Sequence, residues 1–166
     1  MNVQNINTLF KQHQAKEIRK NNLKKYAVLV PVVEIDGELH FIFQVRSSSL
    51  KKQPGDVCFP GGKIEATDPS FKDAAVRETC EEMGLKPSKI KNIHALDFIV
   101  DTQEIYPFIA EISNIDEVKI NKEEVSEIFT IPLSFLLTTA PQKHTVNLKV
   151  EPEPDFPYHL IAAGKN

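Results

Sequence analysis

Three glutamates, Glu78, Glu81 and Glu82, fall within about one turn of a helix predicted to end before Gly84. Arg77 is the only cation next to them in the sequence. Carboxylates three or four residues apart repel one another on a helix and destabilise it unless something neutralises them. A hard divalent cation such as Mg²⁺ would do so, because it binds through carboxylates and through substrate phosphate oxygens. The pattern predicts metal-assisted chemistry on a phosphate compound, with a solvated acidic helix face as the alternative.

The helix that carries these carboxylates has clear end signals. Asp68 is a predicted N-cap, Pro69 suits the first helical position, and Gly84 suits the position just past the last turn. At ~100° per residue the side chains divide into separate faces. These are a core face of Val76, Thr79 and Met83, and a face of Ala74, Ala75, Glu78 and Glu82, where the alanines leave space for a loop or a ligand.

Predicted strands alternate with helices along the rest of the chain. Residues 26–35 and 38–46 are rich in β-branched and aromatic residues, and Asp36-Gly37 between them is a strong hairpin turn. Pro31 predicts an edge or a bulge in the first of these strands. The remaining predicted elements are helices at 5–20 and 69–83, strands at 90–100, 106–112, 144–150 and 158–162, and short helical turns at 123–129 and 131–137. This order predicts one α/β or α+β domain over residues 1–166.

The length, net charge and cysteine content of the chain limit the classes of protein to which it can belong. A length of 166 residues is enough for one domain with a hydrophobic core, and a net charge of −3 argues against the broad basic surface of a nucleic-acid binder. No apolar run approaches ~18 residues, and residues 1–22 lack the apolar core of a signal peptide. Cys58 and Cys80 are too few for a disulfide framework or a zinc site. We therefore expect a soluble, cytoplasmic protein with reduced thiols, no membrane segment and no nucleic-acid partner.

Residues 61–85 resemble the signature box of the Nudix hydrolase family. Residues 77–85, RETCEEMGL, match the second half of the box, with Thr79 in place of the usual aliphatic residue. Such a run of matched types is far more specific than an isolated glycine motif. The resemblance implies a Nudix α/β/α sandwich with a mixed β-sheet.

The first half of the box departs from the family pattern. Five residues separate Gly62 from Asp68, but eight separate Asp68 from Arg77, one more than is usual. Glu65 or Asp68 could therefore take the role of the isolated acid of the box.

A second resemblance covers residues 41–62, FIFQVRSSSLKKQPGDVCFPGG. The coenzyme A pyrophosphatase (CoA diphosphatase) branch of the Nudix family carries a signature of this form just upstream of its box. The positions in register are Arg46, Ser47, Gly55, Phe59, Pro60, Gly61 and Gly62. Lys51 replaces a second arginine and so keeps the charge but loses the bidentate fork, and residues 41–43 replace Leu-Leu-Thr. Residues 123–137, EEVSEIFTIPLSFLL, also resemble this branch.

The resemblance implies a site for Mg²⁺ or Mn²⁺ on the predicted helix. Its ligands would be Glu78, Glu82 and Glu81, with the backbone carbonyl of Gly61 in the Gly61-Gly62 turn. Arg77 would pair with the box acid and hold a carboxylate in place, because ligand positioning is what such a site needs.

Nudix enzymes often recruit one further acid from a distal loop. Glu124 is the candidate here, with Glu127, Glu123 and Glu104 as alternatives. The predicted substrate-binding residues are Arg46, Lys51, Gly61 and Gly62, and Lys52 is either a further phosphate contact or a solubilising loop charge.

The two resemblances imply metal-dependent hydrolysis of the pyrophosphate bond of coenzyme A or its derivatives to 3′,5′-ADP and 4′-phosphopantetheine. Two alternatives stay open. One is hydrolysis of another nucleoside diphosphate derivative or (d)NTP, and the other is a non-catalytic nucleotide-binding module. Members of this branch continue beyond the equivalent of Lys165 with a final strand and a long helix, so we expect a truncated chain, and the same relatives imply a homodimer.

Overall fold

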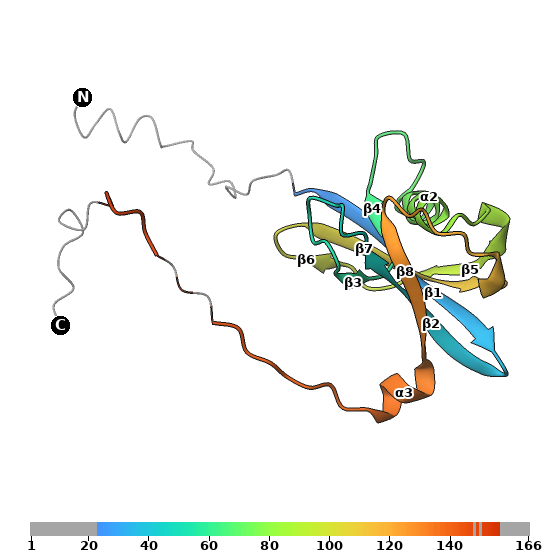
Figure 1. Cartoon of the computed structure of the whole chain (residues 1–166). Coiled ribbons are helices and arrows are strands. Elements are labelled where there is room, and N and C mark those ends of the chain that lie inside the picture. The colour runs from blue at the N-terminus through green and yellow to red at the C-terminus, as the bar shows by residue number, and fades with distance from the viewer. Residues whose placement is uncertain (1–22, 148, 150, 157–166) are drawn as a thin grey trace, which may run out of the picture.

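A mixed β-sheet with a helix across one face forms the body of the protein (Figure 1). The computed structural model describes residues 23–147, 149 and 151–156. The strands are β1 Lys25–Ile35, β2 Glu38–Arg46, β3 Val57–Cys58, β4 Gly61–Lys63, β5 Ile90–Ala95, β6 Ile99–Val100, β7 Glu104–Ile112 and β8 Val125–Pro132. The helices are α2 Phe71–Met83 and α3 Leu133–Thr138, with two 3-10 helices at Pro87–Lys89 and Ile115–Glu117. Among these residues no helix has the length and apolar character needed to cross a membrane.

The long strand β1 lies in the middle of the sheet. The main strand order is β3-β2-β1-β7-β5, with β4 paired to β1, β6 to β7 and β8 to β2. The β1–β7 pair is parallel, whereas the β1–β2 hairpin and the β2–β8 pair are antiparallel. This is an α+β fold with a mixed sheet, as the sequence predicts. Of the two helical layers of the predicted sandwich, the described residues contain the one formed by α2.

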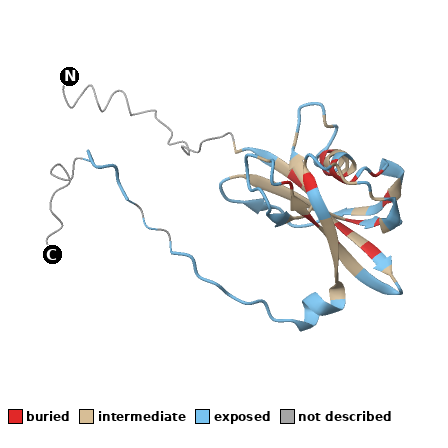
Figure 2. Cartoon of the chain, in the orientation of Figure 1, coloured by how far each residue is buried: buried red, intermediate tan, exposed pale blue. Residues whose placement is uncertain are grey.

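The hydrophobic core lies between α2 and the sheet (Figure 2). Ala27, Leu29 and Val33 alternate along β1 and are buried on the side of the sheet that α2 covers. Ala74 and Ala75 are fully buried in the same cluster. The two alanines therefore do not leave space for a ligand; their small side chains let the helix lie close to the sheet.

The C-terminal end of α2 is where the sequence predicts it, whereas its N-cap differs from the prediction. Gly84 ends the helix with φ of 62°, the left-handed conformation that glycine tolerates best. The N-cap is Ser70, not Asp68, and its hydroxyl oxygen accepts a hydrogen bond from the Asp73 amide at 3.2 Å. Asp68 is not available as a cap because its carboxylate is bound by Arg77.

Three other predicted elements differ in the structure. Pro31, predicted to mark an edge or a bulge, is not at an edge of the sheet: it lies inside β1 opposite Ala110 of β7, where the pairing on the other side is interrupted between the segment paired with β4 and the segment paired with β2. Residues 123–129 were expected to be helical, but β8 starts at Val125 because its branched and aromatic side chains pair along β2. Residues 90–100 form two strands, β5 and β6, that pair with separate parts of β7.

The predictions for the two ends of the chain have different outcomes. Residues 144–147 and 149 form no strand and are exposed, because an alternating pattern needs a neighbouring strand with which to pair. The helix predicted at 5–20 and the strand predicted at 158–162 lie outside the described residues.

The N-cap assignment predicts a stability effect. Ser70→Ala removes the acceptor for the Asp73 amide and should lower the free energy of unfolding by about 1 kcal/mol, measured by urea denaturation. The matched control is Ser88→Ala, an exposed serine in the 3-10 helix Pro87–Lys89, which should change stability by less than about 0.5 kcal/mol. Equal effects of the two substitutions would contradict the assignment.

Candidate active site

A cavity of about 600 Å³ opens beside the carboxylates of α2. It brings together side chains from three distant parts of the chain: Arg46 at the end of β2, Glu78 and Glu82 on α2, and Glu124 in the turn before β8. The turn residues Gly61 and Gly62 also line it, as does Lys52, whereas Lys51 is exposed outside the lining. Most of the predicted site residues therefore meet at one place.

Glu82 is the most buried of the three helix carboxylates, with 5% of its surface exposed. Its Oε2 accepts hydrogen bonds from the backbone amide of Gly61 and from Nε2 of Gln44, each at 2.9 Å. Burial raises the pKa of Glu82 from 4.5 to about 7, although these hydrogen bonds act in the opposite direction. The raised pKa of Glu82 is the result of its burial, which disfavours the ionised form.

Glu78 faces the same cavity one turn earlier on α2. Its Oε1 accepts a hydrogen bond from Nη1 of Arg77 at 2.9 Å, yet burial is the larger influence and raises the pKa of Glu78. A Cβ atom on Gly62 would meet the carboxylate of Glu78, so a larger residue at position 62 would displace that side chain. The turn and the helix carboxylate are therefore packed directly against each other.

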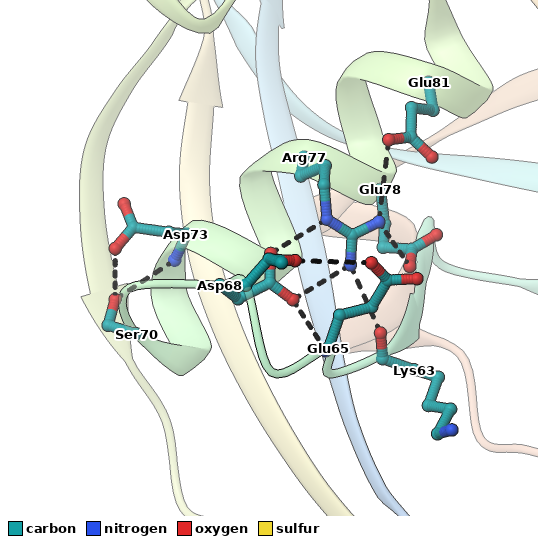
Figure 3. Close-up of polar contacts among 9 residues, drawn as sticks. Lys63, Glu65, Asp68, Ser70, Asp73, Arg77, Glu78 and Glu81 are labelled. Atoms are coloured by element: carbon teal, nitrogen blue, oxygen red, sulfur yellow. Dashed lines mark hydrogen bonds and ion pairs between the residues drawn. The ribbon is translucent and has the colours of Figure 1, made fainter.

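Arg77 links the loop before α2 to the carboxylates of the helix (Figure 3). Its Nε and Nη2 bind the two carboxylate oxygens of Asp68 at 2.8 and 3.0 Å, and Nη2 also donates to the carbonyl of Lys63 at 3.2 Å. The hydrogen bond from Arg77 lowers the pKa of Asp68 to about 2, and the same pairing raises the pKa of Arg77. The acid that pairs with Arg77 is Asp68, whereas Glu65 is exposed and contributes its backbone amide to the Asp68 carboxylate.

Glu81 lies apart from the other two carboxylates. Its side chain is 53% exposed, and its Oε1 is 3.5 Å from Nη1 of Arg77 (Figure 3). It is not among the residues that line the cavity. The helical period explains this, because residue 81 is turned ~100° away from residue 82.

Backbone hydrogen bonds hold Glu124 at the cavity. The amide of Ser47, just after β2, donates to the carbonyl of Glu124 at 2.8 Å, and the amide of Asn121 donates to the carbonyl of Glu82 at 2.9 Å. The turn before β8 is thus fixed to both β2 and the C-terminal end of α2, where helix carbonyls lack partners of their own. The other candidate acids are placed differently: Glu123 and Glu127 are exposed outside the lining, and Glu104 contacts Lys25 and Tyr106.

Arg46, at the end of β2, lines the cavity together with Lys52. Its Nη2 contacts the carbonyl of Lys52 at 3.5 Å, and its Nε is buried without a hydrogen-bond partner in the described structure. A buried guanidinium donor with no partner is costly. Arg46 is therefore suited to an anionic ligand that enters the cavity.

Gln44 was not found from the sequence. It lies two residues before the end of β2, is 1% exposed and contacts Glu82. Its only sequence signal is a polar residue two positions after Ile42, on the buried face of an alternating strand.

The donor set at the cavity fits a hard divalent cation. Glu78, Glu82 and Glu124 offer carboxylate oxygens, and the negative charge of Glu124 helps to raise the pKa of both Glu78 and Glu82. Among the described residues, no group of three or more His, Cys, Asp or Glu side chains is arranged so that it could hold a metal ion by itself. Mg²⁺ commonly binds to one or two carboxylates and completes its shell with water and substrate phosphates, so an open arrangement suits it.

The chain belongs to the NUDIX domain family, whose model matches residues 23–150. The fold and the site are those of a Nudix domain. Solved structures with the same fold include the NUDIX domain of Shewanella oneidensis NrtR complexed with ADP ribose, with a TM-score of 0.57 at 18% identity over 80% of this chain and 87% of that one. The Caenorhabditis elegans Ap4A hydrolase binary complex gives a TM-score of 0.55 at 20% identity over 69% and 84%.

Among curated proteins, the chain is similar to two coenzyme A diphosphatases. It is 36% identical to the mouse peroxisomal coenzyme A diphosphatase NUDT7, over 68% of this chain and 49% of that protein. It is 37% identical to the human mitochondrial coenzyme A diphosphatase NUDT8, over 72% of this chain and 52% of that protein. The chain thus spans about half the length of these relatives. It is also 33% identical to an uncharacterized Nudix hydrolase NudL of Enterobacter, over 68% of this chain and 59% of that protein.

The raised pKa of Glu82 predicts a pH dependence of stability in metal-free protein. The folded state holds the Glu82 proton more tightly than the unfolded state, so stability from this group is present below pH 4.5 and is lost as the pH rises through about 7. The free energy of unfolding of wild type, relative to Glu82→Gln, should fall by about 3 kcal/mol over this range. Urea denaturation in EDTA at several pH values measures it. A difference between the two proteins that does not vary with pH would contradict the prediction.

Proposed function

We propose that the protein hydrolyses the pyrophosphate bond of coenzyme A or its derivatives, with Mg²⁺ or Mn²⁺, to 3′,5′-ADP and 4′-phosphopantetheine. The observation that carries the proposal is the cavity that Glu78, Glu82 and Glu124 line together with Arg46. The coenzyme A diphosphatases among the relatives and the signature residues around Arg46 support the choice of substrate.

The carboxylates have separate roles in the proposed reaction. Glu82 and Glu78 would hold the metal ion, together with the carbonyl of Gly61. When bound, the ion would neutralise charge on the phosphoryl oxygens and lower the pKa of water. Glu81 is exposed and contacts Arg77, so it would act on the ligands through Arg77 or through water rather than from within the cavity.

Glu124 is the proposed general base. It would accept a proton from the attacking water while the water oxygen forms a bond to phosphorus and the bridging oxygen leaves with the other product. Arg46 would bind a substrate phosphate through the part of its side chain that lines the cavity. Lys52, at the cavity, and Lys51, exposed beside it, would meet further phosphate groups at the entrance. Arg77 would keep Glu78 in place through its fork to Asp68.

The test is to incubate the protein with coenzyme A and Mg²⁺ or Mn²⁺ and to measure the release of 3′,5′-ADP by chromatography. Wild type should release it, and Glu82→Gln should not. Glu124→Gln should lower kcat by about 10²- to 10⁴-fold, as expected for loss of a general base. Glu123→Gln is the matched control, because Glu123 is the adjacent acid but is exposed outside the cavity.

The outcomes separate the proposal from its alternatives. If Glu123→Gln loses activity and Glu124→Gln does not, the general base is Glu123 and not Glu124. If wild type leaves coenzyme A intact but cleaves another nucleoside diphosphate derivative or a (d)NTP, the substrate is wrong and the chemistry stands. If wild type binds a nucleotide but cleaves neither coenzyme A, nor another nucleoside diphosphate derivative, nor a (d)NTP, the domain is a nucleotide-binding module without catalytic activity.

A further inference from the structure

Gln44 is a buried polar residue for which the packing of the core gives no reason. Its side chain is 1% exposed, and its neighbours across the sheet are Cys58 on β3 and Ile128 on β8. Strands on both sides therefore fix its backbone. Its Oε1 is buried without a hydrogen-bond partner. An unpaired buried acceptor costs about 1–3 kcal/mol, so an apolar residue of this size would serve stability better.

The other end of the Gln44 amide makes a specific contact. Nε2 donates to Oε2 of Glu82 at 2.9 Å, and its second contact, to the sulfur of Cys58, is long at 3.7 Å. The backbone amide of Gly61 donates to the same Oε2 at 2.9 Å. Both donors thus converge on one oxygen of one carboxylate and leave the other oxygen, Oε1, for a ligand in the cavity.

The two donors come from different elements, and this fixes an angle as well as a position. Gln44 approaches from β2 and Gly61 from β4, while Glu82 extends from α2. A carboxylate held by one hydrogen bond can rotate about it, whereas one held by two donors on the same oxygen has its plane restricted. Groups that orient ligands in this way typically change metal affinity or activity by about 10- to 100-fold when they are removed.

We propose that Gln44 is a positioning residue for the metal site: it holds Glu82 so that Oε1 is presented to the divalent cation. This inference rests on the metal site of the proposed function. It assigns Gln44 no contact with substrate, and its effect passes through Glu82 alone.

The test is a titration of the protein with Mn²⁺ in the absence of substrate, in which binding is measured by electron paramagnetic resonance. Gln44→Met keeps the length of the side chain and removes the donor, and it should weaken Mn²⁺ binding by about 10- to 100-fold. Gln44→Leu, a second variant without the donor, should do the same. The matched control is Thr79→Val. Thr79 is a polar residue of α2 that is also fully buried, and its hydroxyl donates to the carbonyl of Ala75 at 2.7 Å rather than to a carboxylate. This control variant should bind Mn²⁺ as wild type does.

The outcomes distinguish this inference from the proposed function. If wild type binds Mn²⁺ and Glu82→Gln does not, the metal site stands, and wild-type affinity in Gln44→Met would then overturn the role of Gln44 alone. An equal loss in Thr79→Val, or failure of both Gln44 variants to show a cooperative thermal transition, would also overturn it, because the role would be structural. If wild type binds no Mn²⁺, the proposed metal site fails and the inference fails with it.

Discussion

A carboxylate kept almost out of contact with water, that of Glu82, is the constraint on which the arrangement of the protein depends. Placing it there requires α2 to lie close to the sheet, and the buried alanines Ala74 and Ala75 permit this. It also requires donors in the sheet, which Gln44 and the Gly61 amide supply. The cost of keeping this group ionised is what a divalent cation would remove.

The site is joined to the fold by two kinds of contact. On one side, backbone amides tie the turn with Glu124 to Ser47 and to the end of α2, so this part of the cavity is set by the main chain. On the other side, the side chain of Arg77 spans from Asp68 to Glu78, so that part depends on one guanidinium. Main-chain contacts tolerate changes of residue type, whereas the fork of Arg77 tolerates few.

Much of this could be predicted from the sequence because its signals are local. The end of α2 at Gly84 and the β1–β2 hairpin at Asp36-Gly37 follow from turn chemistry. The N-cap was assigned two residues early because Asp68 satisfies the same rule as Ser70, and only the position of Arg77 decides between them.

The remaining features depend on contacts between distant residues. Val125 and its neighbours become a strand because β2 offers a free edge, which residues 123–129 alone do not reveal. Glu81 and Glu82 are equivalent as letters in a motif, but one is exposed and the other buried. Gln44 is an ordinary polar residue until it is seen that 38 positions later in the chain Glu82 needs a donor.

The fork between Arg77 and Asp68 has a consequence for how such proteins diverge. It joins two side chains across a loop, and α2 begins only at the Ser70 cap, so an extra residue between the acid and the helix can be accommodated without moving Glu78 or Glu82. The contact, and not the number of residues in the loop, is what holds Arg77 beside Glu78 in this chain. A motif search with fixed spacing would therefore miss a chain in which the contact between the arginine and the acid is intact.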